Sequence, residues 1–157
     1  SPYQLPRYVR DGGIDVDYLL EDFRRFWRED SEIWTAECGE YSEAAVVLVL
    51  CGFLQRVANG EGRVIREMGT GRGRMDLCIL YKEQRYPIEV KVCRARHDKL
   101  ETVIERGVVQ TGRYMETLGC GKGWLVVFDK REGRSWDERQ FRREVQEEGR
   151  QVTVLGT

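Results

Sequence analysis

Hydrophobic and polar positions change their period along the chain, and each period predicts a different kind of element. The first ten residues show no period and are expected to be extended. Asp15 or Asp17 can cap a helix, and the apolar stripe that follows predicts this helix as far as about Arg28. Residues 40–57 are apolar almost all round, so a buried helix is expected there, ending before an Asn-Gly turn.

A period of two then replaces the helical period, which indicates strands. Strands are predicted over residues 63–68, 75–81 and 86–93, and a four-residue polar turn should join the last two. Helical spacing returns over residues 98–118, where a long amphipathic helix is expected to end near Gly119.

The last part of the chain predicts a strand over residues 124–128, a short helix within 136–148 and a final strand over 151–155. This order is typical of a mixed α/β layered domain, in which a crossover helix follows a three-stranded meander. A length of 157 residues fits a single domain. Its predicted parts are an N-terminal extension and helix (1–40), a core (41–130) and a C-terminal helix and strand (131–157).

Composition narrows the class of protein. A content of 41% apolar and 34% charged residues fits a folded domain rather than a disordered or fibrous chain. The longest apolar run has eight residues and no leader opens the chain, so a cytoplasmic protein without a membrane partner is expected. Five cysteines without paired spacing, with only His97 to add, argue against a disulfide framework and a Cys/His metal site. The missing initial Met indicates a domain cut from a longer chain.

The net charge of −1 hides an asymmetry along the chain. Residues 1–62 carry 6 basic and 12 acidic side chains, whereas residues 63–113 carry 12 basic and 7 acidic ones. The basic segment could form the positive field that phosphates need. Alternatively, it pairs with the acidic segment across the fold, and charge alone favours this second interpretation.

Candidate chemistry lies on two neighbouring strands of the predicted meander. Glu89 and Lys91 share the polar face of one strand, and Asp76 has the same parity on the preceding strand. Pairing of Tyr81 with Tyr86 would set Asp76 beside Lys91 and one diagonal step from Glu89. Two carboxylates and an amine suit Mg²⁺ binding and phosphodiester hydrolysis. The alternative is an ordinary solvent-facing strand, because short Glu-x-Lys triplets are common by chance.

Three segments resemble the motifs of the PD-(D/E)xK nuclease superfamily: residues 71–76 (GRGRMD), 89–91 (EVK) and 110–114 (QTGRY). The last is similar to the motif of the Q-x-x-x-Y subgroup. Residues 41–130 resemble nuclease-like domains at the C-terminus of predicted AAA-type ATPases, although Met75 stands where the family's proline would be. The resemblance implies a restriction-endonuclease-like mixed sheet with an α-β-β-β-α-β core and helices on both faces.

The resemblance also implies site residues, a cofactor and partners. The implied catalytic residues are Asp76, Glu89, Lys91, Gln110, Tyr114 and Glu43. The three acidic residues among them (Asp76, Glu89, Glu43) would be metal ligands, and Lys91 would be the catalytic lysine. The implied cofactor is Mg²⁺, with Mn²⁺ as its substitute. DNA is the implied substrate, with RNA as the alternative, and the ATPase domain of the parent chain is the implied partner.

Gln110 and Tyr114 are four residues apart, so they share a helix face with Gly107, which would let the helix lie close to the sheet. Without the resemblance they would be a boundary residue and a half-buried aromatic residue. The candidate phosphate contacts flank the site: Arg72, Arg74, Arg94 and Arg96. A solvated-loop role fits these arginines about as well.

Three functions follow from these patterns. The first is a Mg²⁺-dependent DNA nuclease, and the second is a non-catalytic nucleic-acid-binding or interaction module of the same fold, attached to an ATPase. The third, an enzyme acting on a small molecule, has only His97 to offer as a base. The glycine-rich segments 69–73 and 119–123 lack nucleotide-binding patterns, so ATP hydrolysis would belong to a preceding domain. Endonuclease or exonuclease action stays open, and a duplex cut with one site per chain would call for a homodimer.

Overall fold

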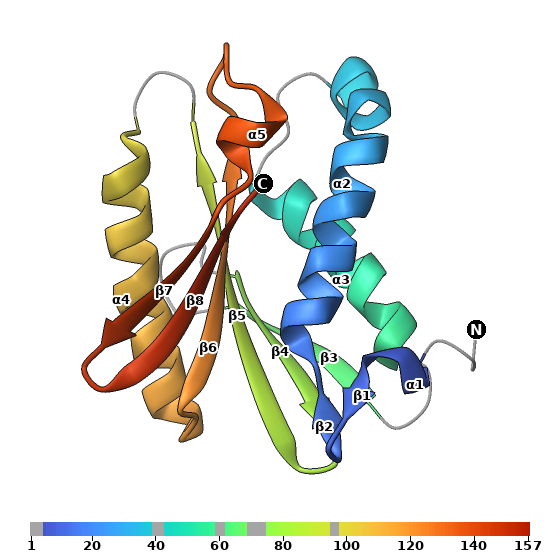
Figure 1. Cartoon of the computed structure of the whole chain (residues 1–157), viewed down its shortest axis with the longest axis vertical. Helices are drawn as coiled ribbons and strands as arrows, with labels where there is room; N and C mark the ends of the chain where they lie inside the picture. Colours follow the sequence, from blue (N-terminus) through green and yellow to red (C-terminus); the bar gives the residue numbers. More distant parts are fainter. Residues whose placement is uncertain (1–4, 39–42, 59–61, 69–74, 95–97) are drawn as a thin grey trace. The chain divides into compact units, whose positions relative to one another are not determined.

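The computed structural model describes residues 5–38, 43–58, 62–68, 75–94 and 98–157 (Figure 1). Internal contacts divide the chain into two units. The first unit consists of residues 1–65 with 79–85, and the second of residues 66–78 with 86–157.

The first unit opens with short elements: α1 (Leu5–Tyr8), β1 (Val9–Arg10) and β2 (Gly13–Ile14). The expectation of an extended start is wrong for residues 5–8, which form a single helical turn. Asp11 and Gly12 both have positive φ and make the tight turn of the β1–β2 hairpin. Asp-Gly is a typical pair for such a turn, and this signal was overlooked in the sequence.

Helix α2 (Val16–Cys38) begins as predicted, because the backbone N–H of Tyr18 donates to Oδ1 of Asp15 at 3.0 Å. It continues well past Arg28, where the apolar stripe stops, since no glycine or proline follows to end it before Gly39. Helix α3 (Glu43–Ala58) confirms the second predicted helix. Its apolar character all round did not mean burial all round, because Leu48 is exposed.

The three predicted strands are confirmed as β3 (Gly62–Met68), β4 (Met75–Tyr81) and β5 (Gln84–Cys93). The predicted four-residue turn is wrong, because only Lys82 and Glu83 lie between the last two strands. Both have positive φ, 46° and 66°, as in the type I′ turns that suit the twist of a hairpin. A two-residue turn makes β4 and β5 antiparallel and pairs Tyr81 with Gln84.

The long helix and the fourth strand of the predicted core are α4 (Leu100–Leu118) and β6 (Lys122–Asp129). Helix α4 ends as predicted at Gly119, which adopts the left-handed conformation with φ 73°. The helix contacts β6 and the two strands that follow, and Figure 1 shows it lying alongside them.

The C-terminal part holds α5 (Trp136–Arg139), β7 (Arg142–Glu147) and β8 (Arg150–Gly156). The short helix predicted within 136–148 is confirmed as α5, whereas strand β7, which follows it, was not predicted. Six strands form one mixed sheet in the order β3-β4-β5-β6-β8-β7. The β5–β6 and β6–β8 pairs are parallel, and β7–β8 is antiparallel. The element order α3-β3-β4-β5-α4-β6 is the predicted one.

The core of the second unit lies between α4 and the sheet. Buried residues from β5, α4, β6 and β8 form one cluster: Cys93, Ile104, Val108, Met115, Leu125, Val127, Val152 and Val154. A Cβ added to Gly107 would lie 2.7 Å from Cδ2 of Leu125, so the predicted close approach of helix and sheet is confirmed.

Cys51, Cys78 and Cys93 are buried thiols, as expected for small hydrophobic residues. None of the helices described here is long and apolar enough to cross a membrane.

Candidate active site on β5 and α4

Glu89 and Lys91 lie on one face of β5, as the alternation predicts. Nζ of Lys91 lies 3.6 Å from Oε1 of Glu89. The Glu89 side chain is only 1% exposed and that of Lys91 is 18% exposed. An ordinary solvent-facing strand therefore does not describe these residues, because charged side chains are rarely buried to this degree without a specific role.

The register of the parallel strands shows which side of the sheet this face is on. Glu89 is the partner of Leu125 on β6, and Lys91 is the partner of Val127. Paired residues point to the same side of a sheet. Leu125 and Val127 belong to the cluster packed under α4. Glu89 and Lys91 therefore face the side of the sheet that α4 covers.

The contacts of α4 also show which flank of the helix faces β5. One flank meets β7, since a Cβ on Gly112 would lie 2.8 Å from Cγ of Glu147, and Glu101 pairs with Arg143 at 2.8 Å. Successive helical residues turn by about 100°, which puts Gln110 on the opposite flank, together with Tyr114. Because β5 and β7 lie on opposite sides of β6 and β8, this flank is directed toward β5.

Gln110 and Tyr114 are shielded to different degrees. Tyr114 is buried, whereas Gln110 is half-buried. The Oε1 atom of Gln110 is hidden from solvent and accepts no hydrogen bond from the residues that the structure describes. A buried polar atom in this state is costly unless another group satisfies it.

The tight β4–β5 turn changes the predicted partner of Asp76. Counting in register from the Tyr81–Gln84 pair sets Asp76 opposite Glu89, rather than beside Lys91. This register differs by two residues from the predicted one.

For some predicted site residues the structure describes only the backbone, and for others it describes nothing. Asp76 and Glu43 lie in β4 and α3, but their side chains are not among those described. Arg72, Arg74 and Arg96 lie outside the described residues altogether.

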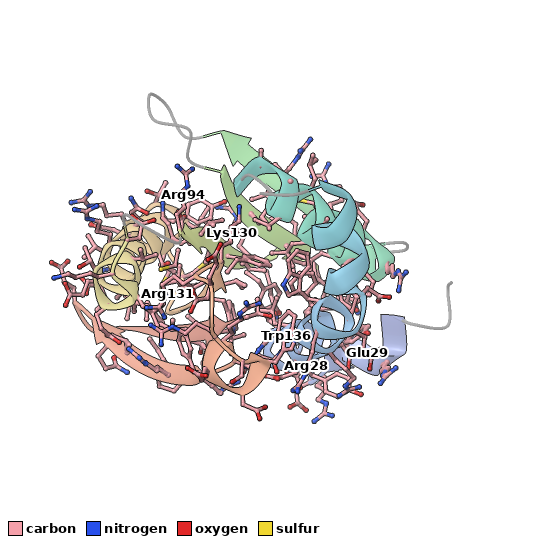
Figure 2. The ribbon with its side chains drawn as sticks, turned by 90° about the horizontal axis from the view of Figure 1, so that it is seen from above. Arg28, Glu29, Arg94, Lys130, Arg131 and Trp136 are labelled. Atoms are coloured by element: carbon pink, nitrogen blue, oxygen red, sulfur yellow. The ribbon has the colours of Figure 1, made fainter. Side chains whose placement is uncertain are left out.

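Arg94 is exposed directly beyond the carboxyl end of β5. Its backbone N–H donates to Oδ2 of Asp98 at 3.0 Å. The ends of β5 and β6 are joined by a hydrogen bond, in which the N–H of Lys130 donates to the carbonyl oxygen of Cys93 at 2.9 Å. Figure 2, which looks down on these strand ends, shows Arg94, Lys130 and Arg131 at this edge. The carboxyl ends of parallel strands are where α/β sheets commonly bind ligands.

A second buried carboxylate, Asp129, ends β6. Nε and Nη2 of Arg131 each donate to it at 2.9 Å, and the Arg131 backbone N–H donates at 3.0 Å. Burial by itself raises the pKa of Asp129, but these bonds from Arg131 hold that pKa below its usual value. Burial, followed by the charge of Asp129, raises the pKa of the adjacent Cys93 thiol to about 11.

Sequence reasoning missed the Asp129–Arg131 pair. Its signal was an acidic residue directly after the apolar strand 124–128, followed by two basic residues at the end of a parallel strand. Three hydrogen bonds from Arg131 satisfy this carboxylate, which fits a structural role at the strand end.

The donor set of the site consists of oxygen atoms. Within the described side chains, no three His, Cys, Asp or Glu residues gather closely enough to hold a metal ion. Two of the three predicted ligands, Asp76 and Glu43, were outside that comparison because their side chains are not described. The described donor fits a hard divalent cation, since Glu89 is a buried carboxylate and carboxylate oxygens are ligands that Mg²⁺ prefers.

Comparisons of the chain with models of protein families, with curated proteins and with solved structures give no match. The resemblance to the PD-(D/E)xK nucleases therefore stays a prediction that rests on the motif residues.

Proposed function

We propose that this chain is a Mg²⁺-dependent nuclease of the PD-(D/E)xK type, with a restriction-endonuclease-like fold, that hydrolyses phosphodiester bonds of DNA. One observation carries the proposal: a nearly fully buried Glu89 with Nζ of Lys91 at 3.6 Å, on the side of the sheet that α4 covers. The order α3-β3-β4-β5-α4-β6 and the Gln110–Tyr114 flank of α4 support it.

Each residue has a distinct part in the proposed reaction. Asp76 and Glu89 would hold Mg²⁺, with Glu43 as a third acidic ligand, and Mn²⁺ would substitute for it. The ion supplies Lewis-acid polarisation of the phosphodiester and a more acidic water. The Lys91 ammonium, held near Glu89, would position the attacking water and stabilise the negative charge that develops on the phosphate.

The surrounding residues would hold the substrate strand. Gln110 presents a buried amide oxygen that lacks a partner among the described residues, and this oxygen would accept a hydrogen bond from the attacking water or from Tyr114. Arg94 at the end of β5, together with Arg72, Arg74 and Arg96, would contact phosphates of DNA, or of RNA as the alternative substrate. An ATPase domain of a longer parent chain is the proposed partner, and a homodimer would allow both strands of a duplex to be cut.

Mg²⁺-dependent stability and cleavage test the proposal. Wild type should melt at a higher temperature with Mg²⁺, because a ligand of the folded state alone stabilises it by about 2.7 kcal/mol at a hundredfold excess over Kd. Asp76→Asn should remove this rise and abolish cleavage of a labelled duplex. Without metal the variant should be as stable as wild type or more so, because one of two opposed negative charges is gone.

Glu116→Gln is the matched control, since Glu116 is an exposed carboxylate on α4. It should cut DNA and respond to Mg²⁺ as wild type does. A wild type that shows neither a metal-dependent shift nor cleavage would contradict the nuclease proposal. DNA binding without either effect would instead support the non-catalytic binding module on the same fold.

A further inference from the structure

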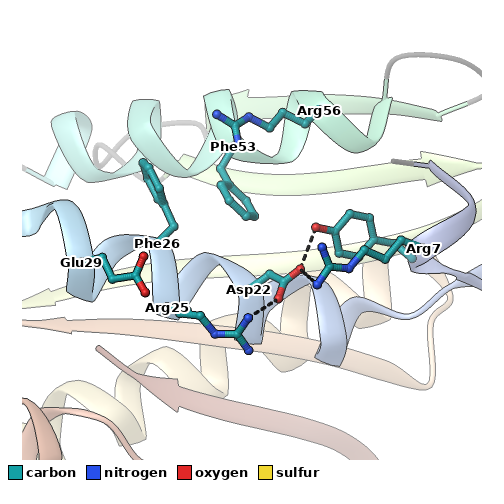
Figure 3. A pocket seen from close by; sticks show the side chains of 8 residues that line it. Arg7, Asp22, Arg25, Phe26, Glu29, Phe53 and Arg56 are labelled. Carbon is teal, nitrogen blue, oxygen red and sulfur yellow. Dashed lines mark hydrogen bonds and ion pairs between the residues drawn. The ribbon is translucent and has the colours of Figure 1, made fainter. Parts of the chain in front are cut away.

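A cavity of about 230 Å³ opens in the first unit, between α2 and α3 with α1 at its edge. Figure 3 shows that the lining side chains come from these three helices, with Phe26 and Phe53 between α2 and α3. The lining residues are Arg7, Tyr8, Asp22, Arg25, Phe26, Glu29, Phe53 and Arg56. None of them takes part in the proposed nuclease site, so this cavity needs an explanation of its own.

One wall of the cavity is aromatic. The rings of Phe26 and Phe53 stack with centroids 5.4 Å apart and an interplanar angle of 29°. Both side chains are half-buried, so part of each ring still faces the cavity. The Arg56 guanidinium lies 5.6 Å from the centre of the Phe53 ring, so a cationic group borders this wall.

The opposite wall is built around Asp22, which is almost fully buried. The hydroxyl of Tyr8 donates to its Oδ2 at 2.8 Å. Nη2 of Arg7 lies 3.7 Å from Oδ2 of Asp22, and Nη1 of Arg25 lies 3.4 Å from its Oδ1. Nε of Arg7 donates to the hydroxyl of Tyr18 at 2.9 Å. The side chains of Arg7 and Arg25 are 54% and 65% exposed, so guanidinium donors remain accessible at the mouth. Each guanidinium has five N–H donors, and Asp22 occupies only a fraction of them.

The arrangement combines a ring-binding wall with an excess of positive charge. Arg7, Arg25 and Arg56 outnumber the two carboxylates, Asp22 and Glu29. Arginine forks match the oxygen geometry of phosphate. Phenylalanine faces stack with nucleobases without regard to base identity. A ligand that joins a phosphate to a planar ring would use both walls at once.

We propose that this cavity binds a mononucleotide, with the base against Phe26 and Phe53 and the phosphate among Arg7, Arg25 and Arg56. Glu29 on the same rim distinguishes a nucleotide from a phosphorylated tyrosine. Its carboxylate would accept a hydrogen bond from a base amino group, whereas the ring of a phosphorylated tyrosine carries no amino donor for it. The cavity is small for a ligand site, which suits one nucleotide rather than an oligomer. The inference does not depend on the proposed nuclease function.

Titration calorimetry on the whole chain with four small molecules tests the proposal. Adenosine 5′-monophosphate should bind at least tenfold more tightly than adenosine, which lacks the phosphate, and than ribose 5-phosphate, which lacks the base. It should also bind at least tenfold more tightly than phenyl phosphate, which has a ring and a phosphate but no amino group. These measurements are made without divalent metal, so that the nuclease site does not contribute.

Three variants locate the site. Arg56→Gln and Phe53→Leu should each weaken binding of adenosine 5′-monophosphate about tenfold. Arg66→Gln, which changes an exposed arginine of β3 outside the cavity, should bind as wild type does. Arg56→Gln removes a group at the protein surface, so it keeps the test valid if Phe53→Leu weakens the fold.

Three results would overturn the inference. The first is that adenosine 5′-monophosphate does not bind to wild type at millimolar concentration. The second is that Arg56→Gln binds it as tightly as wild type. The third is that phenyl phosphate binds as tightly as the nucleotide, which would assign the cavity to a phosphorylated tyrosine instead.

Discussion

At the residue scale, two nearly fully buried carboxylates of the second unit are held in different ways. Asp129 receives a two-pronged contact from Arg131 and a backbone N–H, all within 3.0 Å. Nζ of Lys91 lies 3.6 Å from Oε1 of Glu89. The close donors around Asp129 suit a carboxylate that fixes a strand end, whereas Glu89 is the carboxylate that we propose as a cation ligand.

Asp129→Asn should lower the free energy of unfolding at pH 7 by about 1.5–3 kcal/mol, because it removes hydrogen bonds to a charged group. The pKa of Asp129 is lowered in the folded state, so its contribution is complete above the ordinary value of 3.8. This contribution is lost as the pH falls through the lower folded-state pKa. Urea unfolding at pH 7 and at a series of acid pH values measures both effects.

The matched control is Glu132→Gln, which changes an exposed carboxylate of the following loop. Its unfolding free energy should stay within about 0.5 kcal/mol of wild type. A difference between Asp129→Asn and wild type that stays constant as the pH falls through the acid range would contradict the assigned role of the charge.

At the scale of elements, the position of α4 depends on two glycines where the helix and the sheet meet, one in α4 and one in β6. Gly107 lies against Leu125, and Gly123 of β6 lies against Met115, with a virtual Cβ 2.6 Å from its sulfur atom. Since Leu125 is the register partner of Glu89, one of these close approaches lies at the level of the candidate site. The periodicity of residues 98–118 predicts the helix, and the glycine within it predicts the close approach.

Gly107→Ala and Gly52→Ala test this close approach with the same substitution in two helices. Gly52 in α3 is exposed with open space around it, so alanine should raise the free energy of unfolding by about 0.5–1 kcal/mol. At Gly107 the added methyl would overlap Leu125, so this variant should be about 1–3 kcal/mol less stable than Gly52→Ala. Urea denaturation of both variants gives the comparison. Equal gains at the two positions would show that α4 does not pack closely on β6.

At the scale of the whole molecule, three ion pairs of the acidic N-terminal segment are local. Arg10 pairs with Asp15, Arg24 with Glu21 and Arg25 with Asp22.

Hydrogen exchange should distinguish strands that open locally from strands that open only when the whole molecule unfolds. Strand β6 lies between two parallel neighbours and its residues 123–129 are buried, whereas β7 is an edge strand with mostly exposed side chains. Amides of Leu125 to Val127 should therefore exchange only through global unfolding, and those of β7 should exchange at least tenfold faster. Native-state exchange followed by NMR measures this. Equal protection of β6 and β7 would contradict the assignment of β7 to the edge.

The sequence by itself determined most helices and strands, because burial of one face imposes a period of 3.6 or 2 on the apolar residues. It also determined that Glu89 and Lys91 share a face, since alternation is a local property of a strand. Strand β7 could not be predicted, because an edge strand needs few apolar residues and Val145 alone contacts the core.

Only the tertiary structure decided the pairings. Two non-glycine residues in the β4–β5 turn carry no local turn signal, so the register that sets Asp76 opposite Glu89 depends on the fit of the two strands. The side of the sheet that α4 covers, and the flank on which Gln110 lies, follow from packing between residues far apart in the chain. Such contacts leave no local pattern, because each residue's partner is chosen by the fold and not by its neighbours in sequence.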